Sequence, residues 1–275
     1  KVFSTGGTLG IGTSTGAGTG NVALVANSGM WSNVGTITVG NRGHQNSLIV
    51  SNNGTVFTTH LMVNGNSVGR SNSVVVNGGN LNVSGSLTMG GAGFWGQMIV
   101  TNSGTVVDQF GIIANAANTG SNYVRVVDGG VWNNTRELTV GNAGSSNGLT
   151  IAGGTVVASN AFISRAAFAT NNFIRVDSGS LFVTNAQGTG ALVVSLATNN
   201  QGRGELILNG GATTVNSLFV TNNSVSATNS FFTFTGGTLT TTNAANSVAA
   251  SLILATNSTF SIGGTWNMLG GTSTI

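Results

Sequence analysis

The residues that could perform acid–base chemistry in this chain are few and far apart. Glycoside hydrolysis, the reaction that best suits a small set of carboxylates, needs two carboxyl groups roughly 5–9.5 Å apart. The complete acidic inventory is Asp108, Asp128, Glu137, Asp177 and Glu205. Asp128 and Asp177 are predicted to lie at the same corner of a repeat, two units and about 10 Å apart by the stacking rise of parallel strands. Arg125 and Arg175 stand close to them, so we interpret both carboxylates as members of surface ion pairs.

Metal and nucleotide chemistry have even less support in the sequence. His44 and His60 are the only histidines, and the absence of cysteine excludes thiolate–metal and disulfide frameworks. Residues 91–96 fit G-x-G-x-x-G, but a dinucleotide site needs a helix next, and Gln97 begins a segment that is typical of a strand. The calcium-binding nonapeptide is absent. The sequence therefore predicts no catalytic, cofactor-binding or metal-binding residues, and hence no enzyme.

The basic charge of the chain does not indicate a nucleic-acid-binding protein. A net charge of +3 accompanies only 13 charged side chains, eight basic and five acidic. The arginines are scattered along the sequence: Arg42, Arg70, Arg125, Arg136, Arg165, Arg175 and Arg203. A phosphate-binding surface needs clustered basic residues, so we expect no nucleic-acid partner. No apolar run is long enough for a membrane-spanning helix, so no membrane span is expected in this segment.

Composition instead favours a folded all-β protein. Hydrophobic residues make up 40% of the chain, which has 44 glycines and no proline. Val, Ile, Thr and Phe are plentiful, while the polar helix formers are scarce. The polar positions are filled mainly by Asn, Ser and Thr, as expected of a secreted or surface-displayed protein.

A glycine that follows a short apolar run recurs about every 25 residues. This repeat glycine is Gly29, Gly54, Gly79, Gly104, Gly130, Gly154 and Gly179. The pattern continues less regularly at Gly211 and Gly237 and, with Ser in place of Gly, at Ser258, and an earlier partial copy has Gly7. Three apolar clusters keep a nearly constant distance from it, which predicts three short strands per repeat.

The clusters define three predicted rows of core residues. Five residues before the repeat glycine stand Leu24, Ile49, Val74, Ile99, Leu149, Ile174, Leu206, Phe232 and Ile253, with Val124 one residue early. Two residues after it stand Leu9, Trp31, Val56, Leu81, Val106, Trp132, Val156, Leu181, Thr213, Leu239 and Phe260. Eight residues after it stand Ile37, Met62, Leu87, Ile112, Leu138 and Phe162.

One repeat cannot enclose its own apolar side chains, but stacked repeats form three parallel sheets around a shared interior. The sequence thus predicts one all-β domain over 1–275, a three-sided parallel β-helix (β-solenoid) of about 11 coils of about 25 residues. Partial or irregular coils are expected at 1–20 and 259–275, and a longer loop within 184–203. The asparagines at positions 27, 52, 77 and 102 are expected to hydrogen-bond up the stack as a ladder, or else to be solvated turn residues.

The segment at 127–159, VDGGVWNNTRELTVGNAGSSNGLTIAGGTVVAS, resembles the repeats of autotransporter-associated β-strand proteins. The segments VANSGMWSNVGTITVGN and VTNSGTVVDQFGIIAN have the same spacing of apolar residues, Gly and Asn. The resemblance implies a secreted, surface-exposed or matrix β-helix of bacterial type, and it implies no shared catalytic motif.

We expect a structural or adhesive extracellular repeat protein, a rigid fibre segment that associates end to end. The alternative is a carbohydrate-binding or polysaccharide-degrading β-helix, since that scaffold often serves such proteins. A glycan or another surface ligand is a possible partner. Two irregular segments are candidate ligand surfaces: 90–97, which contains Phe94 and Trp95, and the insertion within 184–203.

Overall fold

The computed structural model describes residues 1–9, 18–195, 202–220, 230–246, 251–254, 258–262, 266–268 and 272–274. Side chains are described for 1–8, 18–195, 202–220 and 230–242. All regular elements in these ranges are β-strands. This confirms the predicted all-β class.

The first strands are short and follow one another in groups of three. They are β1 (Val2–Ser4), β2 (Gly7–Leu9), β3 (Val22–Val25), β4 (Met30–Asn33), β5 (Thr36–Val39), β6 (Ser47–Ser51), β7 (Thr55–Thr58), β8 (His60–Val63), β9 (Ser73–Asn77), β10 (Asn80–Val83), β11 (Ser86–Met89) and β12 (Gln97–Thr101). Several later strands continue through a corner and belong to two sheets, and β16 belongs to all three. These and their neighbours are β13 (Thr105–Ile113), β14 (Tyr123–Val127), β15 (Val131–Val140), β16 (Gly148–Ile163), β17 (Asn172–Val183), β18 (Ala191–Val194), β19 (Gly204–Leu208) and β20 (Ala212–Val220). The last are β21 (Phe231–Phe234), β22 (Gly237–Asn246), β23 (Ser251–Leu254), β24 (Ser258–Ile262), β25 (Trp266–Met268) and β26 (Thr272–Thr274).

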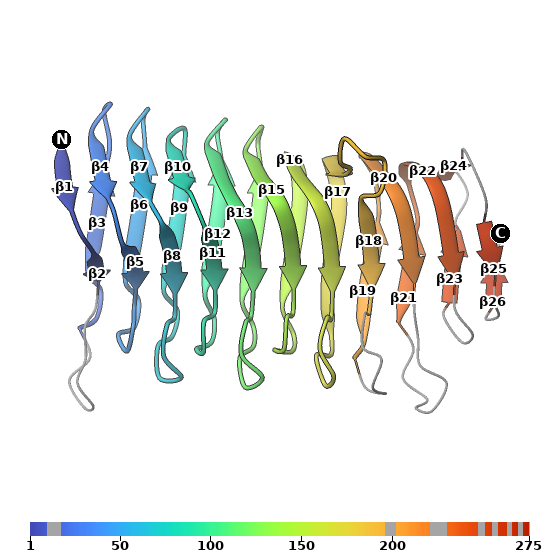
Figure 1. Ribbon diagram of the computed structural model, residues 1–275, viewed down its shortest axis with the longest axis horizontal. Helices are drawn as coiled ribbons and strands as arrows, with labels where there is room; N and C mark the ends of the chain where they lie inside the picture. The colour runs from blue at the N-terminus through green and yellow to red at the C-terminus, as the bar shows by residue number, and fades with distance from the viewer. Residues whose placement is uncertain are drawn as a thin grey trace.

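The strands stack in parallel as three sheets along the long axis of the molecule (Figure 1). Sheet I is β3–β6–β9–β12–β14–β16–β17–β19–β21–β23–β26. Sheet II is β1–β4–β7–β10–β13–β15–β16–β17–β20–β22–β24. Sheet III is β2–β5–β8–β11–β13–β15–β16–β18–β20–β22–β25. This arrangement is the predicted parallel β-solenoid. Within the described residues, about eight complete turns lie between Val22 and Val220, so the number of turns differs somewhat from the predicted eleven.

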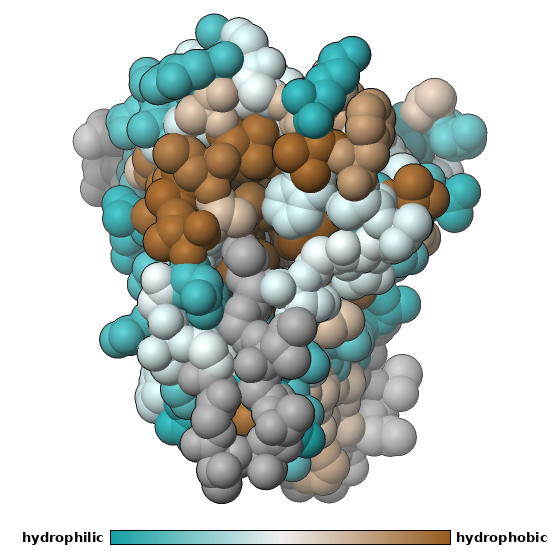
Figure 2. Space-filling view, turned by 90° about the vertical axis from the view of Figure 1, so that its left-hand side faces the viewer, coloured by the Kyte–Doolittle hydropathy of each residue, from teal (hydrophilic) through white to brown (hydrophobic). Residues whose placement is uncertain are grey.

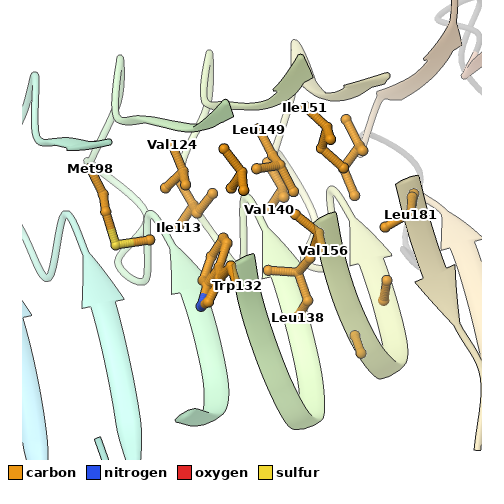
Figure 3. Close-up of a cluster of buried hydrophobic side chains, with 14 of the residues drawn as sticks. Met98, Ile113, Val124, Trp132, Leu138, Val140, Leu149, Ile151, Val156 and Leu181 are labelled. Carbon is orange, nitrogen blue, oxygen red and sulfur yellow. The ribbon is translucent and has the colours of Figure 1, made fainter. Parts of the chain in front are cut away.

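Inward side chains from all three sheets form one continuous core. Figure 3 shows a part of it, in which Met98, Val124 and Leu149 of sheet I face Trp132 and Leu138 of the other two sheets. The predicted row two residues after the repeat glycine is confirmed by strand pairing from Trp31 to Phe260. Leu9 is the exception, because it pairs with Val39 in sheet III, and Val2 takes its place beside Trp31.

The predicted row in sheet I is wrong by one residue in several coils. Val74 is fully buried, but it pairs with Leu48 and Met98. Ile49 and Ile99 pair with Val75 and point outward. The cause is a corner of variable length: three residues separate Ser51 from Thr55, but two separate their partners Asn77 and Asn80. A one-residue shift moves a side chain to the other face of a strand.

The alternation of inward and outward side chains along a strand also corrects the predictions for Leu24 and for part of the row in sheet III. Leu24, expected in the core, lies on the outer face of sheet I and is 62% exposed. In sheet III, the outward residues include Met62, Ile112 and Phe162, while their neighbours Leu61, Gly111 and Ala161 point inward. Ile37, Leu87 and Leu138 are buried as predicted.

The repeat glycine permits close approach between coils. A Cβ atom on Gly54 would lie 2.2 Å from the carbonyl oxygen of Val25 in the preceding coil. On Gly130 it would lie 2.4 Å from the carbonyl oxygen of Val100. Any larger residue here would push neighbouring coils apart. In the coils from Gly29 to Gly154 the positive φ angles fall just before it, for example at Asn52 (48°) and Asn53 (61°), whereas Gly179, Gly211 and Gly237 have positive φ angles themselves.

Candidate functional site

The structure places the five carboxylates at separate points of the solenoid. Asp177 forms an ion pair with Arg175, with 3.0 Å between Oδ2 and Nε, as predicted. Asp128 instead accepts a hydrogen bond from Thr101 Oγ1 at 3.1 Å, and no ion pair joins it to Arg125 within the described ranges. The predicted ion pair is therefore confirmed for Asp177 alone.

Glu137 and Glu205 also contact the adjacent coil. Glu137 pairs with Arg165, whose guanidinium carbon lies 4.9 Å from the centre of the Phe162 ring. Glu205 accepts a hydrogen bond from Thr233 at 3.0 Å. These contacts join one coil to the next, so they indicate a role in stacking.

The histidines lie apart from any carboxylate cluster. His60 Nδ1 lies 2.9 Å from Ser86 Oγ and accepts the backbone N–H of Ser86 at 3.1 Å. A serine–histidine pair can activate a nucleophile when a third group orients the ring, but no described residue hydrogen-bonds to the other ring nitrogen of His60. His44 pairs through its backbone with Arg70. Within the part of the chain that is described, no three His, Asp or Glu side chains come together as a metal site.

The segment at 90–97 forms a corner with two aromatic side chains. β12 begins at Gln97, directly after the G-x-G-x-x-G match at 91–96, which confirms that this match does not open a helix. The Arg70 guanidinium carbon lies 5.7 Å from the Phe94 ring centre and 5.2 Å from that of Trp95. Trp95 is 48% exposed and has a positive φ of 57°. Equivalent corner positions with positive φ carry small or polar residues: Gln45, Ser71, Ser121, Ser146 and Asn171.

The insertion within 184–203 is a loop at Thr184–Gly190, between β17 and β18. Residues 196–201 of the predicted range lie outside the described residues. Asn185 Oδ1 accepts the backbone N–H of Thr189 at 2.9 Å. Asn216 Oδ1 in the next coil accepts the N–H groups of Asn185 and Gly190, at 3.1 and 3.0 Å. The loop is thus closed by its own hydrogen bonds and attached to the solenoid.

The predicted surface ladder of asparagines is incomplete. Asn52 Nδ2 donates to Asn27 Oδ1 at 3.5 Å, and Asn102 Nδ2 donates to Asn77 Oδ1 at 3.1 Å. Between Asn52 and Asn77 the contact is a backbone hydrogen bond of 3.2 Å.

A second ladder, inside the solenoid, was not predicted. Asn46, Asn72, Asn122, Asn147 and Asn172 are all fully buried at the corner before sheet I. Asn147 donates its backbone N–H (3.0 Å) and Nδ2 (2.9 Å) to Asn172 Oδ1. Asn46 donates in the same way to Asn72, and Asn122 donates to Asn147. The available signal was an Asn two residues before the first inward apolar residue of five sheet I strands, β6, β9, β14, β16 and β17.

Asp108 is a buried carboxyl on the inner side of sheet II. Its Oδ2 accepts a hydrogen bond from Trp132 Nε1 at 2.7 Å, and Oδ1 has no partner. Burial raises the pKa of Asp108 to about 8, and the hydrogen bond from Trp132 lowers it only in part. Asn134, which pairs with Asp108 in the adjacent coil, also has a buried Oδ1 without a partner. Trp31 makes the equivalent contact to Ser4 Oγ at 2.9 Å, so this geometry recurs as a packing device.

One face of the solenoid combines aromatic rings with arginines. Tyr123 and Arg125 on β14, and Phe173 and Arg175 on β17, all point outward from sheet I. Gly148 of β16 pairs with both aromatic residues. The two ring centres are 6.3 Å apart. We call Tyr123, Arg125, Gly148, Thr150, Phe173 and Arg175 the aromatic–arginine patch.

A groove of about 250 Å³ continues from this patch. Its walls are formed by Asn171, Asn172, Phe173, Arg203, Gly204, Glu205 and Phe231. The patch was not predicted, because the sequence separates its two halves by 50 residues. A signal was present: Asn-Tyr-Val-Arg at 122–125 and Asn-Phe-Ile-Arg at 172–175 repeat one motif. These surfaces offer ring faces and hydrogen-bond donors, which suit ligand binding better than covalent chemistry.

Comparison with protein-family models, with curated proteins and with solved structures gives no match. Within the described ranges, no helix has the length and hydropathy needed to cross a membrane.

Proposed function

We propose that this protein is an adhesive or structural repeat protein that works outside the bacterial cell or on its surface, as a rigid rod and not as an enzyme. One observation carries the proposal. A single uninterrupted core runs through stacked coils, while most outward side chains are small and neutral. Such a stack supplies stiffness and a long surface, which are the properties that adhesion or a fibre requires.

The contacts of the carboxylates support a non-enzymatic role. Asp177 is engaged by Arg175, Asp128 by Thr101, and Asp108 lies in the interior. A polysaccharide-degrading enzyme needs two accessible carboxyl groups at a suitable separation. The carbohydrate-binding alternative has a specific observation in its favour, the aromatic–arginine patch.

End-to-end self-association is part of the proposal. The end of the solenoid that carries β1 and β3 shows an apolar surface (Figure 2). Phe3 of β1 is 73% exposed. A hollow of about 370 Å³ there is lined by Lys1, Val2, Ala23, Leu24, Val25, Ala26, Gly29, Met30 and Trp31. An apolar sheet end of this kind suits stacking against another β-coil.

The test uses the 275-residue chain on beads and on electron-microscope grids. We expect beads coated with the folded chain to be retained on polysaccharide-coated surfaces, and beads coated with the heat-unfolded chain to be released. Micrographs are expected to show rods joined end to end. Equal retention of both bead types would overturn the adhesive function. Rods that stay single at high concentration would overturn self-association. Turnover of oligosaccharides that Asp128→Asn or Asp177→Asn abolishes would show an enzyme instead.

A further inference from the structure

The aromatic–arginine patch is a local specialisation on a repetitive surface. Tyr123 pairs with Gln97, and earlier coils carry Ser73 and Ser47 at this position. Arg125 pairs with Ile99, which follows Val75 and Ile49. The fold therefore does not require an aromatic ring or an arginine at either position. A side chain that the scaffold does not need is a candidate for recognition.

The two rings form one continuous apolar surface. Tyr123 is 38% exposed, and its ring is tilted by 44° from that of Phe173. Gly148 lies between them, and a Cβ atom on it would be 2.3 Å from Cζ of Phe173. Only glycine leaves room for the Phe173 ring to lie over β16. The patch thus offers a ring surface wide enough for the C–H face of a sugar.

Polar and charged groups border this ring surface. Arg125 is exposed, and it forms no ion pair with any described residue. Arg175 is held by Asp177, and Thr150 lies between the two arginines in the sheet. In the adjoining groove, Arg203 donates to Asn171 Oδ1, and Glu205 accepts from Thr233.

The charges that face the patch and groove are Arg125, Arg175 and Arg203 against Asp177 and Glu205, with Asp128 at the far end of Arg125's strand. Arg175 is held by Asp177, whereas Arg125 and Arg203 form no ion pair among the described residues. Arg125 is on the same strand as Tyr123, and its planar guanidinium can bind a ligand carboxylate in a fork geometry.

We propose that the aromatic–arginine patch and its groove bind an acidic glycan, a chain of sugars that carry carboxylates. The patch is open and runs along the rod axis, because its residues come from successive coils, so it fits an extended chain. A sugar ring packs on Tyr123 and Phe173, and its carboxylate receives hydrogen bonds from Arg125. The inference rests on the adhesive function proposed above and assigns its ligand.

Single-stranded nucleic acid is the competing ligand, since it also uses aromatic rings and arginines. It requires a basic groove along the backbone and separate rings for successive bases. Here the two rings contact one another, and Arg175 is neutralised by Asp177. The geometry therefore favours the glycan.

The experiment is affinity electrophoresis of the full chain in gels containing polygalacturonate, dextran or no polymer, with oligothymidylate in a parallel titration. Wild type is expected to be retarded by polygalacturonate and not by dextran. Arg125→Gln and Tyr123→Ser are each expected to weaken binding about tenfold, the loss of one charge-assisted hydrogen bond or one stacked ring. Tyr123→Ser places in β14 the residue that other coils carry there.

The matched control is Phe110→Ser with Arg136→Gln, an arginine–aromatic pair on sheet III whose guanidinium carbon lies 5.6 Å from the ring centre. This control should bind as wild type does, and circular dichroism should show the same strand content in every variant. Equal retardation by dextran, stronger binding of oligothymidylate, or variants that bind like wild type would overturn the proposal. If beads still adhere while the patch variants have no effect, the adhesive function stands and the site is wrong.

Discussion

At the scale of single residues, the buried polar groups of the solenoid differ in how completely they are hydrogen-bonded. The asparagines of the internal ladder hydrogen-bond to one another between coils, as Asn147 does to Asn172, which compensates for the loss of water. Asp108 has a partner for only one of its two carboxyl oxygens. A protonated carboxyl group has an O–H donor, which the ionised form lacks. The neighbouring Asn134 has an Oδ1 without a hydrogen-bond partner, so the surroundings of Asp108 suit the protonated form.

The Asp108 site predicts that stability falls as the pH rises. Its folded pKa of about 8 lies above the ordinary value of 3.8, so the unfolded chain releases this proton first. The contribution of Asp108 to the free energy of unfolding is fully present below pH about 4. It is lost between pH about 4 and about 8, by up to about 1.4 kcal/mol per pH unit. Asp108→Asn should flatten this fall in urea titrations from pH 4 to 9. Asp128→Asn, at an exposed carboxyl, is the control, and a fall that persists in Asp108→Asn would contradict the assignment.

At the scale of strands, the sequence predicted the positions of the strands better than which of their side chains point inward. The row of core residues in sheet II, from Trp31 to Leu239, was predicted correctly because the strands of sheet II begin at a constant distance from the repeat glycine. Sheet I lies across a corner that gains or loses one residue, so the same count placed Ile49 and Ile99 in the core when they face outward. The internal asparagine ladder was missed because a corner asparagine has the same sequence whether it points inward or into water. The aromatic–arginine patch was missed because stacking brings together residues 50 positions apart.

The corrected register predicts that the same substitution has a large effect on stability at Val74 and a small one at Val75. Val74→Asp would bury a carboxylate between Leu48 and Met98, at a cost of at least several kcal/mol. Val75→Asp would place the same charge on the outer face of sheet I, with a change of about 1 kcal/mol or less. Thermal unfolding followed by circular dichroism compares the two variants. Equal destabilisation of both would show that the inward and outward faces are assigned wrongly.

At the scale of the whole molecule, a uniform scaffold carries a localised surface. Stacking makes each coil depend on its neighbours, and the core is continuous across all coils whose side chains are described. Ligand binding on such a scaffold must come from outward residues that differ from the small, neutral side chains found on most of the surface. The aromatic–arginine patch does so on sheet I, between β14 and β17, and its groove extends to β21.

The most direct test of this account is hydroxyl-radical footprinting of the intact chain with and without polygalacturonate. Tyr123 and Phe173 should lose reactivity when the polymer is bound, because a sugar chain would cover their rings. Phe57 and Phe168, exposed aromatic residues outside the patch, should react as before. The predicted result is protection of Tyr123 and Phe173, together with the groove residue Phe231, and of no aromatic residue outside the patch and groove. Unchanged reactivity of both rings under conditions of full binding would contradict the account.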